Sequence, residues 1–252
     1  MAIPTLDLIL VIDVGNSGAK VGAVRKEDVA GPVRLPRVDG RAVREFATPL
    51  LKGQKAVIAV AGSDPAKVDG LVWEVKKLHL GTVVSVGPDH AGIPAAVVDE
   101  PAQAGVDRRL QVLAATHLAG EAVAVISCGT AMTVDVGNKD GALVGGAILP
   151  GLGLGARSLS AGTARLPLID LPGEAGMPAT DTDRAIRTGV LIGGAGAAER
   201  LLGDAGIGAD QPVYLTGQDG KHLQPHLERT VRPHPGLGIL GVALAVRARP
   251  PR

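Results

Sequence analysis

The chain has 252 residues, 46% of them hydrophobic and 20% charged, a globular composition long enough for one large domain or two smaller ones. Its 26 basic and 25 acidic residues nearly cancel, and one Trp, one Tyr and one Phe leave little surface for stacking bases. We therefore expect no nucleic-acid partner and no membrane partner. The single cysteine, Cys128, allows no internal disulfide and favours a reducing, cytoplasmic location.

The first half of the chain predicts buried strands separated by helices. Residues 6–14 are rich in Leu, Ile and Val and stop at the sequence GNSG, which is typical of a buried strand entering a tight turn. The residues that follow alternate enough to form the returning strand of a hairpin. The sequence then predicts, in chain order, a strand over 55–63, a helix over 66–80, a strand over 81–87, an ordered loop over 88–106 with three prolines, and a helix over 107–120.

The second half begins the same pattern again at Ala122. A strand, a glycine turn and a second strand are predicted over 122–136, and NKDG at 138–141 is a good hairpin turn. A helix over 182–202, a strand ending in the glycine-rich sequence TGQDG at 216–220 and a closing helix over 236–246 follow. Strands and helices alternate throughout, so the predicted class is α/β.

The opening turn recurs about half a chain later. Aligning VIDVGNSGAKVGAV with VISCGTAMTVDVGN places Asp13 on Ser127, Gly15 on Gly129 and Asn16 on Thr130. Such a repeat is what two related domains would show. We therefore predict a first domain over residues 1–120, with the first turn, and a second domain over 121–252, with the second and third turns.

Both turns are suited to phosphate, because glycine exposes backbone N–H groups that converge on an anion. Ser17 and Thr130 add hydroxyls, and Asn16 adds an amide. Lys20 can place positive charge on a transferring phosphate, and Asp13 can bind Mg²⁺ through water. A turn of this kind taken alone is more often an ordinary hairpin than a phosphate loop. The hypothesis of a bound nucleotide depends on two matching turns, with TGQDG as a third where an adenosine could lie.

Five segments, DVGNSGAK, GVDRR, CGTAMTVDV, GGAILPGL and GTARLP, occur in an order and spacing that resemble the type III pantothenate kinases of the sugar kinase, chaperone and actin superfamily. The resemblance implies an α/β fold with two ribonuclease-H-like (actin-like) domains facing a nucleotide cleft. It also implies a homodimer that uses ATP and Mg²⁺ to phosphorylate pantothenate to 4′-phosphopantothenate, the first step of coenzyme A biosynthesis.

The resemblance assigns roles to particular residues. ATP and its phosphates would contact Asp13, Val14, Gly15, Asn16, Ser17, Gly18, Ala19, Lys20, Gly129 and Thr130. Pantothenate would contact Val98, Gly105, Val106, Asp107, Arg108 and, from the neighbouring subunit, Thr182. Asp107 would accept the hydroxyl proton. Because Asp107 also begins a predicted helix, its alternative role is a plain N-cap.

Three positions depart from the family pattern. Ser127 replaces an aspartate that holds K⁺ or NH₄⁺, and losing one charge about 3 Å from a cation costs on the order of 5 kcal/mol at an effective dielectric near 20. We therefore expect a weak or absent monovalent cation site. Val98 replaces a tyrosine that lines the substrate site, and Gln218 stands in an adenosine turn that usually has two adjacent glycines.

These departures leave an alternative open. A catalytically degenerate relative could bind nucleotide or pantothenate in a regulatory role, and Ser127 and Val98 favour it. The retention of Asp107 beside Arg108 favours an active kinase, and an enzyme with a different acceptor is a third possibility. We expect Cys128 to be a small buried residue, and the six histidines show no metal-ligand spacing.

Overall fold

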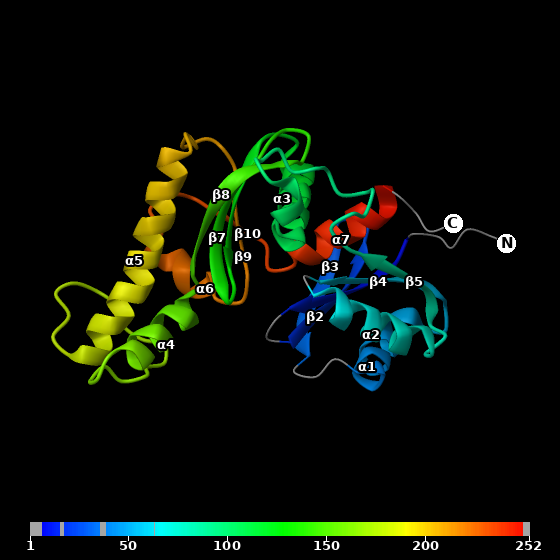
Figure 1. Cartoon of the computed structure of the whole chain (residues 1–252), viewed down its shortest axis with the longest axis horizontal. Helices are drawn as coiled ribbons and strands as arrows, with labels where there is room; N and C mark the ends of the chain where they lie inside the picture. Colours follow the sequence, from blue (N-terminus) through cyan, green and yellow to red (C-terminus); the bar gives the residue numbers. More distant parts are fainter. Residues whose placement is uncertain (1–6, 16–17, 36–38, 63, 249–252) are drawn as a thin grey trace. The chain divides into compact units, whose positions relative to one another are not determined.

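The computed structural model describes residues 7–15, 18–35, 39–62 and 64–248. These residues form two compact units (Figure 1). The first unit contains the described residues up to Leu118, the short segment Asp140–Leu143 and the chain from Gly236 onward. The second unit contains Ala119–Lys139 and Val144–Pro235. Among the described residues, none of the helices is both long and apolar enough to span a membrane.

The first unit is built on a five-stranded sheet with the order β3-β2-β1-β4-β5. Strands β1 to β3 are antiparallel neighbours, whereas β4 and β5 run parallel to β1. Its strands are β1 (Ile9–Gly15), β2 (Gly18–Arg25), β3 (Asp28–Leu35), β4 (Ala56–Gly62) and β5 (Gly81–Val86). Its helices are α1 (Gly40–Leu51), α2 (Pro65–Lys76), α3 (Val106–Ala119) and α7 (Leu237–Ala248), with a 3-10 turn at Pro101–Gln103.

Helices cover both faces of this sheet (Figure 1). Alternate residues of β1, β2 and β4 pack against buried side chains of α1 and α2, among them Val43 and Val68. Helix α7 lies on the other face, and α3 packs on α7 so closely that a Cβ on Gly241 would lie 2.1 Å from the Leu110 carbonyl oxygen. Asp64 begins α2 as its N-cap, since its carboxylate accepts the N–H groups of Ala66 and Lys67.

The second unit has the same strand arrangement. Its sheet order is β10-β9-β6-β7-β8, with β6 and β7 antiparallel and with β9 parallel to both β6 and β10. The strands are β6 (Val123–Cys128), β7 (Ala131–Gly137), β8 (Leu143–Pro150), β9 (Val213–Thr216) and β10 (Arg232–Pro233). The helices are α4 (Leu152–Gly162), α5 (Thr182–Asp204) and α6 (Gly220–Leu223), with a 3-10 turn at Gln224–His226.

The core of the second unit lies between its sheet and its helices. Side chains of β6, β7 and β9 pack with Leu152 of α4, with Leu191 and Leu202 of α5 and with Leu223 of α6. Figure 1 shows α4, α5 and α6 on one side of this sheet. Asp181 is the N-cap of α5, since its carboxylate accepts the Arg184 N–H at 2.8 Å.

The predicted α/β class is confirmed, and most predicted strands and helices are present within a few residues. The strands β3 and β10, the helices α1, α4 and α6 and the two 3-10 turns were not predicted. Strand β3 has Gly31 and Pro32 in its middle, and α1 has Pro49 near its end, residues that are uncommon inside strands and helices. The division of the chain also differs from the predicted boundary at residue 120, because α7 and Asp140–Leu143 belong to the first unit. The assignment of 1–120 and 121–252 as ribonuclease-H-like domains stays a prediction.

Candidate active site

The first glycine turn joins β1 to β2 in the first unit. Asp13 lies directly opposite Lys20 in the antiparallel pair, two residues before the strand ends at Gly15. Gly18 begins the returning strand with a φ of +126°, a conformation that favours glycine. Val14 and Ala19 are buried next to the turn. The other two predicted residues of this loop, Asn16 and Ser17, lie outside the described residues.

Asp13 has the most informative electrostatics in this unit. Its side chain is half-buried at the end of β1, and desolvation raises its pKa to about 6, against an ordinary value of 3.8. The positive charge of Lys20 lowers the pKa of Asp13, and the negative charge of Asp107 raises it. The first glycine turn and the start of α3 are therefore electrostatic neighbours, although they are about ninety residues apart in the sequence.

Asp107 lies at the start of α3. It is the second residue of the helix and is exposed, while Val106 before it is buried and Arg108 after it is half-buried. The residue before the helix is Gly105, whose carbonyl accepts the Arg109 N–H at 3.2 Å. The N-cap alternative for Asp107 is therefore wrong, because the residue lies inside the first helical turn. A carboxylate is still stabilised there by the helix dipole.

Gly105 determines where the Asp107 carboxylate can lie. A Cβ on Gly105 would come within 2.7 Å of Asp107 Oδ1. This distance is shorter than an ordinary van der Waals contact, so any larger residue at position 105 would displace the carboxylate. Glycine at this position keeps the carboxylate close to the backbone at the start of the helix.

Arg109 was not identified from the sequence as a residue of this region. It is 8% exposed, and its guanidinium donates hydrogen bonds to the carbonyls of Pro88, at 2.8 Å, and Pro94, at 3.0 Å and 3.3 Å. Burial lowers the pKa of Arg109, and nearby Asp89 raises it. Arg109 thus attaches α3 to the ordered loop that precedes Val98, which is half-buried. Arg109 follows the buried Val106 by three residues in α3, and residues three apart lie on the same face of a helix. This spacing was a signal in the sequence that Arg109 faces the interior.

The second glycine turn, in the second unit, joins β6 to β7. Gly129 donates its N–H to the Ala131 carbonyl at 3.0 Å, and Gly151 donates to the Thr130 carbonyl at 3.1 Å. A Cβ on Gly151 would lie 2.1 Å from the Gly129 oxygen, so only glycine permits this approach of α4 to the turn. Gly129 is half-buried and Thr130 is exposed.

The third turn is attached to the same strand end. Gly217, with a φ of +90°, lies so close to the backbone that a Cβ would be 2.2 Å from the Cys128 carbonyl oxygen. The same oxygen accepts the Asp219 N–H at 3.2 Å. The Cys128 side chain is fully buried, and burial followed by the negative charge of Asp219 raises its pKa to about 12. Cys128 therefore stays a thiol at neutral pH and is no nucleophile.

Ser127 has hydroxyl-bearing neighbours on both sides. In register it lies opposite Thr133 of β7 and Thr216 of β9. Thr133 donates its hydroxyl hydrogen bond to the buried Asp135 carboxylate at 2.7 Å, so that carboxylate is already engaged. The corresponding pair in the first sheet is the charged pair Asp13 and Lys20, whereas Ser127 and Thr133 are both neutral hydroxyl residues. Within the part of the chain that the structure describes, no group of three His, Cys, Asp or Glu residues could hold a metal ion.

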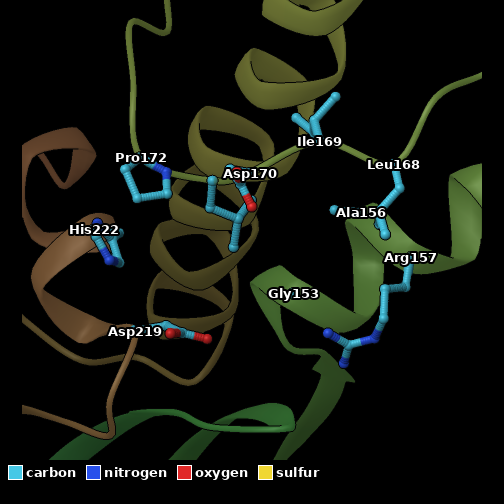
Figure 2. Close-up of a pocket in the computed structure, with 10 residues that line it drawn as sticks. Gly153, Ala156, Arg157, Leu168, Ile169, Asp170, Pro172, Asp219 and His222 are labelled. Carbon is cyan, nitrogen blue, oxygen red and sulfur yellow. The ribbon is translucent and has the colours of Figure 1, made fainter.

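A cavity of about 310 Å³ lies beside the third turn, which contributes Asp219 to its lining (Figure 2). Figure 2 shows Gly153 and Arg157 of α4 on one side, Asp219 and His222 on another, and the loop that contains Asp170 above them. The lining is largely apolar in that loop, which contributes Leu168, Ile169, Leu171 and Pro172. This volume and this mixture of apolar wall and a few polar groups suit a small organic ligand.

The remaining predicted residue, Thr182, is the first residue of α5 in the second unit and is exposed. Asp13, Lys20 and Asp107 come together within the first unit. Gly129, Thr130 and the third turn come together within the second.

Comparison of the fold with solved structures defines the class. A Baf family protein from Campylobacter jejuni aligns over 96% of this chain and 98% of its own, with a TM-score of 0.61 and 18% sequence identity. An activator of 2-hydroxyisocaproyl-CoA dehydratase from Clostridium difficile, solved with bound ADPNP, aligns over 96% of each chain, with a TM-score of 0.54 and 12% identity. The fold is that of the actin-like and sugar kinase proteins, with two five-stranded sheets.

Sequence comparison identifies the family. The type III pantothenate kinase profile matches residues 9–204. A type III pantothenate kinase from Roseiflexus sp. strain RS-1 is 30% identical over 94% of this chain and 97% of its own, and one from Halorhodospira halophila is 35% identical over 85% and 88%. The type III pantothenate kinase from Synechococcus elongatus is 42% identical over a shorter match. This match covers 48% of this chain and 49% of that relative, about half of each. The chain belongs to the type III pantothenate kinase family.

Proposed function

We propose that this protein transfers the terminal phosphate of ATP to the primary hydroxyl of pantothenate, giving ADP and 4′-phosphopantothenate. Family membership supports the reaction. The observation that carries the proposal in this chain is the electrostatic coupling of Asp13, Lys20 and Asp107. It brings a phosphate-binding turn and a carboxylate able to accept a proton into one neighbourhood, as phosphoryl transfer to a hydroxyl requires.

Asp107 is the proposed general base. A primary hydroxyl barely ionises at neutral pH, so a carboxylate that takes the proton as the oxygen attacks raises the rate, typically by about 10²–10⁴. The exposed position of Asp107 leaves it accessible to an acceptor, and Gly105 keeps its carboxylate at the start of α3. Arg108 beside it and Val98 are the proposed pantothenate contacts of this unit, with Gly105 and Val106.

Asp13 fits a role in holding Mg²⁺ with the nucleotide phosphates. Its carboxylate ionises only at a cost, because burial raises its pKa to about 6, and a divalent cation would offset that cost. A single carboxylate is sufficient, since Mg²⁺ is usually held by one or two carboxylates together with phosphates and water. When bound, the ion neutralises charge on the transferring phosphate. Lys20, directly opposite Asp13, supplies a fixed positive charge to the same phosphates.

The second unit has proposed nucleotide-binding features of its own. Glycine turns such as the one at Gly129 suit a phosphate, and Thr130 is exposed at this one. The cavity lined by Gly153, Asp219 and the loop around Asp170 has a volume suited to the adenosine (Figure 2). Ser127 gives this turn no negative charge, so we propose that K⁺ or NH₄⁺ binds weakly there and contributes little to the rate.

We also propose a cytoplasmic homodimer formed through the second unit. The edge strand β8 exposes Val144 and Ile148, the latter 66% accessible, and α4 and α5 expose Leu154, Leu159 and Ile192. We propose that these side chains form one interface, as contiguous exposed apolar patches commonly do. Thr182 would then reach pantothenate in the partner subunit. Sedimentation at micromolar concentration tests the dimer, and a monomer at all concentrations would contradict it.

The direct test of the function is release of ADP from ATP and Mg²⁺ with and without pantothenate. ADP that forms only when pantothenate is present, together with 4′-phosphopantothenate identified by mass spectrometry, is the expected result. Nucleotide binding without pantothenate-dependent ADP release would refute the kinase and support the degenerate binding protein, for which the relatives compared above give no support.

A further inference from the structure

Three charged side chains lie in one row across the first sheet. In register, Asp13 of β1 is opposite Lys20 of β2, and Lys20 is opposite Arg34 of β3. Directly paired residues of antiparallel strands project from the same face of a sheet, with Cβ atoms about 4.5–5.5 Å apart. The row therefore extends from the half-buried Asp13, through the half-buried Lys20, to the exposed Arg34.

The side chain of Arg34 lies against the first glycine turn. A Cβ built on Gly18 would be 3.8 Å from Arg34 Nε and 3.0 Å from the Leu35 carbonyl oxygen. Gly18 is in the same turn that presents its backbone to phosphate, so the guanidinium is already placed beside the proposed phosphate site. An arginine that pointed away from the sheet edge would not come this close to Gly18.

Lys20 and Arg34 are like charges directly opposite each other, an arrangement that destabilises a strand pair. Asp13 lies on the far side of Lys20 and is itself reluctant to ionise, because burial raises its pKa to about 6. An anion bound between the two cations would remove this repulsion.

We propose that Arg34 binds the terminal phosphates of the nucleotide together with Lys20. The planar guanidinium offers two parallel N–H donors to phosphate oxygens, which the ammonium of Lys20 cannot do. The evidence for anion binding by this row is the strand register and the position of Arg34 Nε close to Gly18. Its assignment to the phosphates of ATP rests on the proposed function.

The test compares Arg34→Gln with Arg25→Gln, which removes an exposed charge at the opposite end of β2 from the turn. Calorimetric titration with Mg²⁺-tripolyphosphate is the binding assay. We expect Arg34→Gln to weaken binding by about 10- to 100-fold, the range for charged hydrogen bonds, and Arg25→Gln to leave it within about twofold. Arg34→Lys should recover part of the loss, because it restores the charge but not the two parallel donors.

A second readout separates this role from a structural one. Without ligand, Arg34→Gln should melt close to the temperature of the original protein, because Arg34 is exposed and surface substitutions change stability little. With ATP, kcat/KM for ATP should fall while the KM for pantothenate stays within about twofold. Tripolyphosphate affinity of Arg34→Gln within about twofold of the original protein would overturn the inference, as would a lower melting temperature with equal losses for both substrates.

The failure of this inference can be told apart from the failure of the proposed function. An original protein that binds tripolyphosphate through Arg34 but releases no pantothenate-dependent ADP contradicts the kinase and supports the anion site. An active kinase in which Arg34→Gln has no effect contradicts the role of Arg34 alone. An original protein that does not bind tripolyphosphate at all overturns the anion site directly.

Discussion

Asp13→Asn should make the ligand-free protein more stable at neutral pH while it removes activity. Burial raises the pKa of Asp13 from 3.8 to about 6, a difference of about two units, and each unit is worth about 1.4 kcal/mol. The folded state therefore binds this proton more tightly than the unfolded state does. The stability associated with that proton is fully present below pH 4 and is lost as the pH rises toward 6 and above, at a cost of about 3 kcal/mol by pH 7.5.

Asparagine does not carry this cost, since it is neutral at every pH. The expected advantage of the Asn variant is about 3 kcal/mol at pH 7.5, or roughly 6–12 °C in melting temperature for a chain of this size, and it shrinks to less than about 1 kcal/mol near pH 4. The assay is thermal unfolding at the two pH values without nucleotide or Mg²⁺. Asp28→Asn, at the exposed start of β3, is the matched control and should show no such pH-dependent gain.

Two results would refute the reasoning. An Asp13→Asn variant that is no more stable than the original protein at pH 7.5 would mean that the buried carboxylate is not costly. An equal gain at both pH values would mean that the effect is unrelated to ionisation. Addition of Mg²⁺-ATP should stabilise the original protein more than the variant, because only the original retains the carboxylate proposed to hold the ion.

Four further substitutions test other parts of the site. Asp107→Asn should lower kcat by about 10²–10⁴ with little change in ATP affinity, and activity within about threefold would contradict the general base. Gly105→Ala should leave the melting temperature almost unchanged but reduce kcat, because its Cβ would lie within 2.7 Å of the Asp107 carboxylate and displace it; full activity would mean that the carboxylate position is unimportant. Ser127→Asp should create or strengthen activation by K⁺, measured as the rate with K⁺ against the rate with Na⁺, and a flat response would contradict the assignment of the cation position. Gly217→Ala should destabilise the second unit strongly, because its Cβ would lie 2.2 Å from the Cys128 oxygen, and normal thermal stability would show that the turn can move.

Much of the fold could be predicted from the sequence, because periodicity and turn residues indicate local structure. The buried strand before Gly15 has an apolar pattern that hardly fits another structure. The placement of α7 could not be predicted, since its near-continuous apolar sequence indicates burial but not the partner. The division of the chain into two units depends on that partner.

The site was predictable where glycine and charge stand together in the sequence, and not where the register brings residues together. The turn at Gly15 and Gly18 was evident from the sequence. The burial of Arg109 against two proline carbonyls was missed because a second arginine after Arg108 is easily taken for a surface charge. The position of Arg34 beside Lys20 was missed because β3 itself was not predicted.

The second unit holds its three segments together through backbone atoms. Gly151 and Gly217 each approach a carbonyl oxygen of the β6–β7 turn at a distance that excludes any side chain, and the Asp219 N–H binds the same strand end. The backbone framework of these turns is therefore nearly independent of the side chains around it. Positions such as Ser127 and Gln218 can change their chemistry without moving the framework. If the proposed nucleotide and cation contacts lie here, their selectivity can be redesigned, or can drift between species, by single substitutions that cost the fold little.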